Sequence, residues 1–476
     1  MLSPLDDRYA SIVRPLDVLL SEEGLNRARL TVEAEWLIYL AASGAVAELR
    51  QLTPAECARL RSYATAFDGA AAAGLKAIER ETGHDVKAVE YYLKNKIRDT
   101  SLADVAEFVH FCCTSEDINN LAYGILLRRA VAGTWLPAAA GLVGHLAGRA
   151  RAYRDQPMLA RTHGQPATPT TAGKEMAVFA SRLDRQLRRV GQQQFLGKFN
   201  GATGTYGAHV AACPGADWPR LSRDFVQSMG LEWNPLTTQI EPHDYMAELF
   251  CDIARFNTIL HNLNTDMWHY ISLGYFRQLP GGTVGSSTMP HKINPIRFEN
   301  SEANTEVSNA LLNVLADNLI TSRMQRDLSD SSLLRNIGAA LGHSLVAIAS
   351  TTAGLLGLEL APAALARDLD EAWEVLGEAY QSVMRRSGLD QPYERVKNLT
   401  RGTGVTRSTV HDFIRAQHLP PADEAALLKL TPATYTGLAG QLVDYLGDTG
   451  NPGPETPGAA FPDQDGRALP PGSAAP

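Results

Sequence analysis

Apolar residues at helical spacing run through most of the sequence. Between positions 246 and 267 a large apolar residue recurs every three or four positions: Met246, Leu249, Ile253, Phe256, Leu260, Leu263 and Met267. Runs with the alternation of a β-strand are scarce, whereas the helical spacing recurs in segments 21–43, 176–190, 299–322, 337–358 and 363–386. Helices of this length are typical of a bundle that spans a whole molecule or an oligomer. We therefore expect an almost all-α fold built around long helices.

One of these segments has the length of a membrane span. From Asn336 to Leu358 there is no Asp, Glu, Lys or Arg, and about 20 apolar residues suffice to cross a bilayer. The stretch nevertheless contains several polar side chains, among them His343 and Thr351. Because the centre of a large bundle also requires a helix that is apolar on most sides, we expect a buried helix here and no membrane partner.

The balance of charge argues against a polyanionic partner. The chain has 44 Lys and Arg against 52 Asp and Glu, a formal net charge of −8, so no general positive field attracts nucleic acid or an anionic membrane surface. An anionic ligand would have to be bound by a local cluster of donors. The start of the chain, MLSPLDDRYA, lacks the basic and apolar regions of a secretory signal, so the expected location is the cytoplasm.

Polar loops punctuated by Gly and Pro separate the helical segments and carry most of the reactive side chains. They contain no dinucleotide-binding glycine pattern, P-loop, H-E-x-x-H zinc motif or nucleophile elbow, and the five cysteines show no metal-binding spacing. What remains is acid–base chemistry on an anion, with Ser, His, Lys, Asn, Gln and Thr as donors. The loops are TGHDVKAVEYY (82–92), CTSEDINN (113–120), RTHGQPATPTT (161–171), GKFNGATGTYG (197–207), TTQIEPHD (237–244) and GSSTMPHKINP (285–295).

The loop GSSTMPHKINP holds the densest set of donors. Pro290 and Pro295 prevent a helix through it, and the glycines before it make its approach flexible, so it could close over a substrate and exclude water. Ser286 or Ser287 could act as a base if Lys292 and backbone N–H groups stabilised the alkoxide. The alternative is that the serines only form turns and that Lys292 is a solvated lysine.

His163, in the sequence Thr-His-Gly-Gln-Pro, is the candidate proton donor to a leaving group. Taken alone, such a loop histidine is more often a hydrogen-bonded structural residue. Lys292 and Asn294 could stabilise negative charge that develops on a substrate carboxylate. Each residue by itself leaves these alternatives open, and only the loops as a set distinguish between them.

As a set, the loops resemble a known family. GSSTMPHKINP resembles the signature of the fumarase/aspartase superfamily, whose members are all-α, usually tetrameric, and eliminate fumarate from a substituted succinate. The other loops, from LDDRYA to MQRDLSDSSLLRN, resemble the bacterial adenylosuccinate lyase family over about residues 3–446. The resemblance implies β-elimination of fumarate from adenylosuccinate, giving AMP, and from the succinylcarboxamide ribotide SAICAR, giving AICAR, in purine biosynthesis.

Carried over position by position, the resemblance implies a role for each matching residue. Ser286 becomes the general base and His163 the general acid, with His84 as a supporting partner. Gly83 departs from the family pattern, in which Asn often precedes His-Asp, so a side-chain contact would be lost there, whereas a backbone contact could remain. The positions implied to hold the carboxylates, ribose or phosphate of the substrate are Arg8, Tyr9, Gly83, His84, Asp85, Thr114, Ser115, Gln239, Ser287, Lys292, Asn294, Asn300, Arg326, Ser331, Ser332, Leu333, Leu334 and Arg335.

The resemblance also implies an assembly and a domain division. Family sites are built from loops of three subunits, so we expect a homotetramer that acts on small-molecule substrates with neither a metal nor an organic cofactor. The implied parts are an N-terminal helical domain at 1–110, a central helical bundle with the signature loop at 111–362, a C-terminal helical domain at 363–447 and a tail at 448–476. The tail is rich in Gly and Pro and is expected to be disordered.

Two other interpretations stay open at this point. Another fumarate-releasing lyase, such as argininosuccinate lyase, would not need a phosphate pocket, so Arg8, Arg326 and Arg335 argue against it. A non-catalytic structural homologue would not need to retain both His163 and Ser286.

Overall fold

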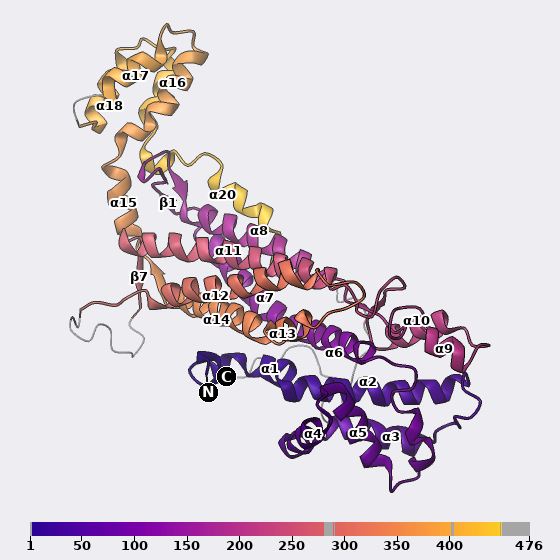
Figure 1. Cartoon of the computed structure of the whole chain (residues 1–476). Coiled ribbons are helices and arrows are strands. Elements are labelled where there is room, and N and C mark those ends of the chain that lie inside the picture. The colour runs from indigo at the N-terminus through magenta and orange to yellow at the C-terminus, as the bar shows by residue number, and fades with distance from the viewer. Residues whose placement is uncertain (1, 280–288, 290, 401–403, 448, 450–476) are drawn as a thin grey trace.

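The computed structural model describes residues 2–279, 289, 291–400, 404–447 and 449. The molecule is elongated, with a central bundle of long helices between two smaller helical regions (Figure 1). The all-α expectation is confirmed, because the strands among the described residues are two or three residues long and form only two-stranded sheets. Apart from Thr449, the tail at 448–476 lies outside the described residues.

Long helices that contact one another along their lengths form the bundle. The apolar residues that recur between 246 and 267 lie on one helix, and Leu249, Ile253 and Phe256 of this set are fully buried. A π-helical segment, Val131–Trp135, joins the first two helices of the region. The helices are α6 (Ser115–Ala130), α7 (Leu136–Ala152), α8 (Ala172–Gly191), α11 (Asp244–Ser272), α12 (Ile296–Leu319) and α14 (Ile337–Leu356).

Buried polar side chains fix the register of α11, α12 and α14. Asn264 of α11 donates to Ser301 of α12 at 2.8 Å, and Thr351 of α14 donates to Asn264 Oδ1 at 2.8 Å. The same arrangement recurs two turns away in a set made of Asn257, Ser308 and Ser344. A slip of one helix along another would leave these buried groups unpaired, which costs free energy. These hydrogen bonds therefore fix the position of the start of α12 along the axis of α14.

The uncharged segment 336–358 contains α14 and ends at the first residue of β8 (Leu358–Leu360), and the burial of α14 confirms the buried-helix prediction. Ala340, Leu341 and Ala347 are fully buried, and the helix contacts α1, α7 and α12. Within the described part of the chain, two stretches, Ser115–Ala152 and Ser329–Leu356, are long and apolar enough to cross a membrane by length and composition alone. A core helix passes this test as readily as a membrane span does.

The N-terminal region packs beside one end of the bundle and shares its core. Trp36 of α2 is fully buried, with its ring centroid 4.3 Å from that of Phe199. Contacts of α2 with α6 and of α1 with α14 join the two regions. The helices are α1 (Ala10–Leu20), α2 (Glu22–Ser43), α3 (Pro54–Thr65), α4 (Gly69–Thr82) and α5 (Asp85–Ile97), with 3-10 turns at Pro4–Asp6 and Ala103–Phe108.

The segment 363–386 is not the single helix that its periodicity predicted. α15 (Pro362–Asp370) ends early, a 3-10 turn follows at Trp373–Leu376, and α16 (Gly377–Arg386) then begins. Leu369 and Val375 pack with Leu159 beside the bundle, whereas Leu376 and Tyr380 belong to a separate apolar core. Because the two halves of the apolar run are buried in different places, the chain has to turn between them.

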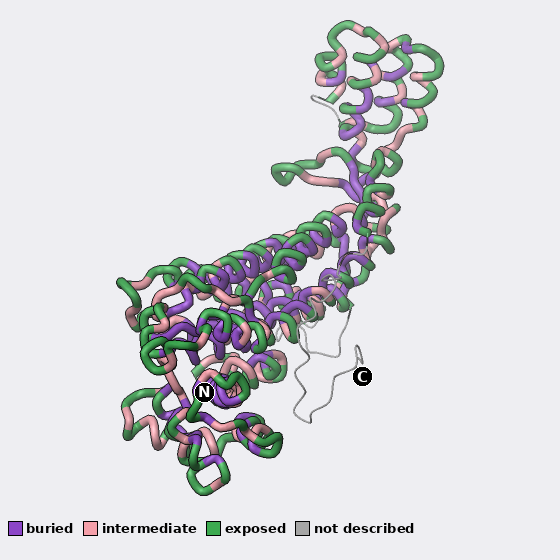
Figure 2. Tube along the Cα trace, turned by 90° about the vertical axis from the view of Figure 1, so that its right-hand side faces the viewer, coloured by how far each residue is buried: buried purple, intermediate pink, exposed green. Residues whose placement is uncertain are grey.

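This separate core lies in the C-terminal helical region, and Figure 2 shows its buried residues apart from the larger group in the bundle. Its remaining helices are α17 (Pro392–Thr400), α18 (Arg407–Arg415) and α19 (Pro421–Lys429). After them come 3-10 turns at Pro432–Thr434 and Val443–Leu446, with α20 (Ala439–Leu442) between them. The last turn returns to the bundle, since Val443 and Leu446 join its core. The division into three domains stays a prediction.

Short strands and helices hold the loops of the bundle in place. β1 (Pro157–Met158) pairs with β4 (Thr170–Thr171), and β2 (Arg161–Thr162) with β3 (Gln165–Pro166), both antiparallel. β5 (Leu196–Gly197) pairs in parallel with β6 (Glu232–Trp233), and β7 (Phe276–Gln278) pairs antiparallel with β8 (Leu358–Leu360). The short helices are α9 (Gly207–Ala212), α10 (Trp218–Ser228) and α13 (Ser329–Leu334).

Candidate active site

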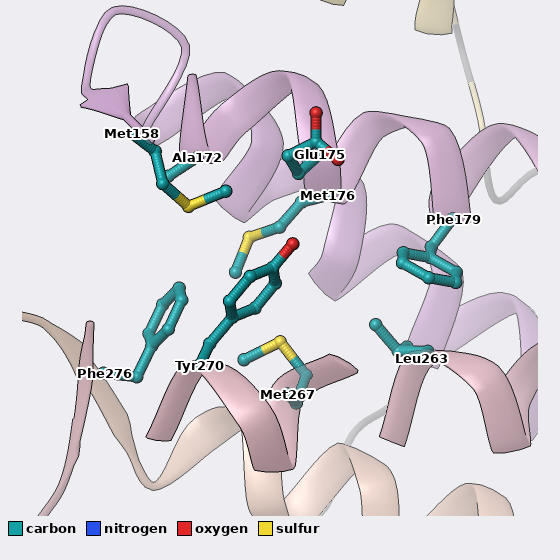
Figure 3. A pocket seen from close by; sticks show the side chains of 9 residues that line it. All are labelled: Met158, Ala172, Glu175, Met176, Phe179, Leu263, Met267, Tyr270 and Phe276. Atoms are coloured by element: carbon teal, nitrogen blue, oxygen red, sulfur yellow. The ribbon is translucent and has the colours of Figure 1, made fainter. Parts of the chain in front are cut away.

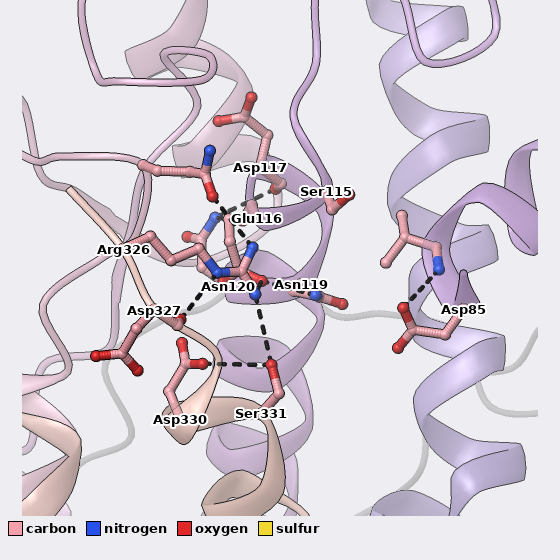
Figure 4. A network of polar contacts seen from close by, with 12 residues as sticks. Asp85, Ser115, Glu116, Asp117, Asn119, Asn120, Arg326, Asp327, Asp330 and Ser331 are labelled. Atoms are coloured by element: carbon pink, nitrogen blue, oxygen red, sulfur yellow. Dashed lines mark hydrogen bonds and ion pairs between the residues drawn. The ribbon is translucent and has the colours of Figure 1, made fainter. Parts of the chain in front are cut away.

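The first two turns of α6 form the centre of a polar network (Figure 4). Thr114 precedes the helix, and its N–H donates to Asp117 Oδ2 at 2.8 Å, as in a capping box. Ser115 opens the helix and is half-buried. The polar residues that follow are buried, and each is paired with another segment of the chain; they are Glu116, Asp117, Asn119 and Asn120.

Asp117 holds the loop GKFNGATGTYG against α6. Its Oδ1 lies 2.9 Å from Lys198 Nζ, and both side chains are 0% exposed. The same oxygen accepts the N–H of Asn200 at 3.0 Å. Asn200 in turn donates to Thr237 Oγ1 at 2.8 Å. The loop therefore positions the segment that carries Gln239.

Arg326 joins two of the loops that sequence analysis singled out. Its Nη2 pairs with Glu116 Oε1 at 2.9 Å, and its Nη1 donates to Gln239 Oε1 at 3.3 Å. Nη2 also donates to Ser331 Oγ at 3.4 Å (Figure 4). Gln239, Arg326 and Ser331 are thus gathered around one guanidinium, most of which is buried.

A buried carboxylate lies next to Ser331. Asp330 Oδ1 accepts from Ser331 Oγ at 3.3 Å, and its Oδ2 lies 3.6 Å from Nε2 of the buried His243. Burial opposes ionisation of Asp330, but the nearby imidazole of His243 and the guanidinium of Arg326 hold its pKa below the ordinary value. Asp330 is therefore ionised at neutral pH and adds a negative charge close to Arg326.

Gly83, His84 and Asp85 bring the start of α5 close to α6. Gly83 ends α4 with φ +66°, a left-handed conformation that suits Gly or Asn, so the departure from the family pattern is compatible with the backbone. His84 Nδ1 accepts the N–H of Lys87 at 3.3 Å. On its other side, His84 Nε2 lies 3.4 Å from Ser115 Oγ. Two of the candidate residues, from different helices, are in contact here.

Asp85 connects α5 to Arg335. Its Oδ2 lies 2.7 Å from Arg29 Nη2 and 3.2 Å from Arg335 Nη2. Burial opposes ionisation, but the charge of Arg29 and the N–H of Val86 keep the pKa of Asp85 below its ordinary value. Arg335 also pairs with Glu22 at 2.6 Å. Its guanidinium is therefore held between two carboxylates.

Arg335 lines a groove of about 810 Å³ between α1 and the start of α14. The residues before it lie on α13. Ser332 is exposed and Leu333 half-buried, while Leu334 belongs to the apolar core. Any contact of Leu334 with a substrate would therefore involve its backbone.

Tyr9 and Asn300 meet at the start of α12. Tyr9 Oη donates to Asn300 Oδ1 at 2.7 Å, and Asn300 Nδ2 donates to Ser350 Oγ of α14 at 2.7 Å. Arg8 is exposed, with its guanidinium carbon 6.0 Å from the centre of the Tyr9 ring. The N-terminal segment is thereby joined to the helix that follows the signature loop.

Five of the eleven residues of the signature loop, 285–288 and 290, lie outside the described residues. Ser286 and Ser287 are among those outside, so their proposed roles stay predictions. Lys292 is exposed and Asn294 is half-buried. Gln278 of β7 donates to the carbonyl of Ile293 at 2.7 Å, which anchors the end of the loop to the bundle.

His163 occupies the two-residue turn between β2 and β3. Its φ is +54° and that of Gly164 is +75°, as the central residues of a type I′ hairpin turn require. The side chain is exposed. Arg161 of the same hairpin pairs with Asp368 of α15 at 2.7 Å. The hairpin follows β1 and lies toward the end of the bundle opposite α6 and α13 (Figure 1).

Within one chain, the candidate residues therefore fall into separate groups. The group around α6 comprises His84, Asp85, Thr114, Ser115, Gln239, Arg326, Ser331 and Arg335. The second group is Tyr9 and Asn300, at the start of α12. His163 lies apart from both groups, on the hairpin between β2 and β3 toward the other end of the bundle.

A small cavity lies between α8 and α11 (Figure 3). Its volume is about 10 Å³, which is room for about one water molecule and for no substrate. Apolar side chains surround it except at Glu175 and Tyr270. Among the described residues, no cluster of three or more His, Cys, Asp and Glu side chains is arranged to hold a metal ion.

Sequence reasoning missed the residues that hold the α6 network together: Arg29, Glu116, Asp117, Asn119 and Lys198. One signal was available. In TSEDINN, acidic and amide residues follow Thr-Ser at positions 116, 117, 119 and 120, more polar groups than the first turns of a bundle helix can bury unless each has a partner.

Comparisons with known proteins point to one family. A family model described as lyase matches residues 10–308, and one described as adenylosuccinate lyase C-terminal matches residues 322–436. The chain is 48% identical to the adenylosuccinate lyase of Haemophilus influenzae and 49% identical to that of Escherichia coli (strain K12), each over 447 residues. Both alignments cover 94% of this chain and 98% of the relative.

Solved structures at low sequence identity share the fold. The 3-carboxy-cis,cis-muconate lactonizing enzyme from Pseudomonas putida superimposes with a TM-score of 0.72 at 21% identity, over 90% of this chain and 95% of that one. A fumarate lyase from Mesorhizobium sp. BNC1 gives a TM-score of 0.73 at 20% identity, over 90% of this chain and 96% of that one.

Proposed function

The chain belongs to the adenylosuccinate lyase family of the fumarase/aspartase superfamily, and from this premise we propose which of its residues carry the reaction. The reaction is β-elimination of fumarate from adenylosuccinate, which leaves AMP. The enzyme is a carbon–nitrogen lyase that acts on small molecules. The same chemistry on SAICAR gives AICAR.

In the proposed mechanism, Ser286 removes a proton from the succinyl carbon beside a carboxylate. The negative charge spreads into that carboxylate, where Lys292 and Asn294 stabilise it. His163 donates a proton to the departing nitrogen as the C–N bond breaks. Fumarate and the nucleotide amine are the products, and no electrons are exchanged with a cofactor. These roles rest on the resemblance of the loops.

The network around α6 supports a nucleotide-binding role for that end of the molecule, and it is the observation that carries the proposal. Arg326 and Arg335 lie on either side of α13, and their positions are fixed by one carboxylate for Arg326 and by two for Arg335. A guanidinium presents a planar set of donors that suits a phosphate. In a chain with a net charge of −8, such a local cluster is what an anionic substrate requires.

We propose that the active form is a homotetramer whose sites combine loops of several subunits. The separation of the candidate residues within one chain supports this, because the His163 hairpin and the α6 network lie toward opposite ends of the bundle. Juxtaposed antiparallel copies of the bundle would bring such ends together. We further propose that the enzyme works in the cytoplasm, without a metal or organic cofactor and without nucleic-acid or membrane partners.

One assay tests the function directly. Purified protein is mixed with adenylosuccinate, and the ultraviolet absorbance of the nucleotide is followed together with the release of fumarate. We expect equal amounts of AMP and fumarate. Failure to turn over adenylosuccinate, with release of fumarate from argininosuccinate instead, would overturn the assignment.

A further inference from the structure

Arg29 lies at the centre of the α6 network but has almost no exposed surface. It belongs to α2, and only 1% of the residue is exposed. Its Nε donates to Asn119 of α6 at 2.8 Å, and its Nη1 donates to Asn26 at 3.0 Å. Its Nη2 pairs with Asp85 of α5 at 2.7 Å. Every nitrogen of this buried guanidinium therefore has a partner, and the partners come from three helices.

Two of these partners lead to the arginines proposed to bind phosphate. Asp85 Oδ2, which pairs with Arg29, also lies 3.2 Å from Arg335 Nη2. Asn119 donates to Glu116 Oε1 at 2.7 Å, and the same oxygen pairs with Arg326 at 2.9 Å. Arg29 is therefore linked to Arg335 through one shared carboxylate, that of Asp85. It is linked to Arg326 through the amide of Asn119 and the carboxylate of Glu116.

We infer that Arg29 is a positioning residue, which sets Arg335 and Arg326 for the phosphate of the substrate without touching the substrate itself. This inference rests on the proposed function, in which those two arginines hold the phosphate. Arg29 and Arg335 both pair with Asp85. Because Arg29 takes part of the negative charge of this carboxylate, Arg335 pairs with it less tightly and keeps N–H groups available for an anion.

Loss of Arg29 would weaken phosphate binding in two ways that act in the same direction. Asp85 would pair more closely with Arg335, and the N–H groups of Arg335 would then be less available to the phosphate. The local positive potential around the phosphate would also fall, since a buried cation is screened little by solvent. The succinyl end of the substrate, held by other loops, would be affected far less.

The test compares ligands with and without the phosphate. For Arg29→Lys and the wild type, KM and kcat are measured with adenylosuccinate, and dephosphorylated succinyladenosine is used as a competitive inhibitor. Lysine keeps the charge, but its single ammonium nitrogen cannot take the positions of the three guanidinium nitrogens that contact Asn119, Asn26 and Asp85. We expect KM for adenylosuccinate to rise about tenfold or more, the scale of a lost charged hydrogen bond, with little change in kcat or in the inhibition constant of succinyladenosine.

Arg27→Lys is the matched control. Arg27 lies on the same helix and pairs with Glu23 at 2.7 Å, but neither contacts the network. The control should leave both constants unchanged. Melting temperature and oligomer size are recorded for each variant. If Arg29→Lys fails to assemble, Asn119→Ser, which breaks the route to Glu116 without removing a charge, should shift KM for adenylosuccinate in the same direction by a smaller factor.

Arg335→Lys, measured in parallel, separates this inference from the proposed function. If Arg335→Lys weakens adenylosuccinate alone while Arg29→Lys weakens both ligands equally or neither, then Arg29 is only structural and the inference is wrong. If Arg335→Lys itself shows no dependence on the phosphate, the phosphate assignment of Arg335 fails, and the inference fails with it.

Discussion

At the scale of single residues, the α6 network is notable for how many charges it buries. Arg29, Glu116, Asp117 and Lys198 are each 2% exposed or less, and each has an oppositely charged partner. Buried ion pairs contribute little net stability, because desolvation offsets the attraction. We interpret these pairs as devices that orient loops, which is how the arginines at the surface of the network gain fixed positions.

Ser286→Ala tests the proposed base. The variant should bind adenylosuccinate but turn it over at least ~10²-fold more slowly, the scale of a lost general base. Ser287→Ala should change kcat less and KM more, because its proposed role is contact with the substrate. Steady-state kinetics of both variants would check this, and near-normal turnover by Ser286→Ala would rule out the assignment.

Arg326→Lys tests whether a guanidinium is needed for the phosphate. Lysine keeps the charge and could still pair with Glu116, but it loses the planar set of donors. KM for adenylosuccinate should therefore rise by about tenfold, with a much smaller effect on succinyladenosine. A loss of the same factor for both ligands would show that Arg326 holds the loops or a carboxylate instead.

At the scale of elements, the start of α6 joins three segments that are distant in sequence. Asp117 holds the loop that follows β5, Asn119 contacts Arg29 of α2, and Glu116 contacts Arg326 before α13. Each contact lies within the first two turns of the helix, so the positions of all three segments depend on one short stretch of backbone.

Removing one partner of the buried Asp117–Lys198 pair should be costly. Lys198→Met leaves an unpaired buried carboxylate, and we expect a loss of about 3–5 kcal/mol in the free energy of unfolding. Asp117→Asn should also destabilise the fold, whereas the double variant should lose less than the sum of the two. Chemical denaturation of the three variants measures this coupling, and strictly additive losses would contradict it.

A second contact of the same region predicts a pH dependence of stability. His110 Nδ1 lies 2.6 Å from Oε1 of the fully buried Glu33. Burial lowers the pKa of His110, but the charge of Glu33 and the hydrogen bond to it outweigh burial and raise the pKa above 6.5. The stabilisation is therefore fully present below pH 6.5 and is lost as the pH rises through the raised value.

The melting temperatures of the wild type and of His110→Gln, measured from pH 6 to pH 9, check this sign. The melting temperature of the wild type should exceed that of His110→Gln by the largest amount near pH 6, and the difference should shrink as the pH rises. Glu33→Gln is the control, because it removes the carboxylate that raises the pKa. A difference that grew with pH would contradict the assignment.

At the scale of the whole molecule, the length of the bundle separates the candidate residues. A helix rises about 1.5 Å per residue, so a 29-residue helix such as α11 extends over about 40 Å. The His163 hairpin and the α6 network lie toward opposite ends of this bundle (Figure 1). If His163 and the α6 network serve one site, as we propose, that site takes residues from more than one chain.

Mixing two inactive variants tests the shared site. His163→Ala and Ser286→Ala proteins should each be nearly inactive, but hybrids formed under conditions that allow subunit exchange should regain part of the activity. Hybrid oligomers would contain some sites that take His163 from one chain and Ser286 from another. Absence of any recovery, with exchange demonstrated by mixed labels, would mean that each site comes from a single chain.

The sequence by itself determined the fold class, the family and the reaction. Helical periodicity is a local property, so segments such as 246–267 and 337–358 could be recognised as long helices without knowing their neighbours. The signature loop, GSSTMPHKINP, is equally local. Periodicity misled only at 363–386, because spacing does not tell which core receives each apolar residue.

Only the tertiary structure decided which residues are partners. Arg29 and Asp85 are 56 positions apart, and Glu116 and Arg326 are much further apart, so no local pattern joins them. The structure also separated His163 from the α6 network within one chain. The physical reason is that burial, and with it the pairing of buried charges, depends on how helices pack across the whole bundle, whereas helix propensity and loop chemistry are properties of short stretches of chain.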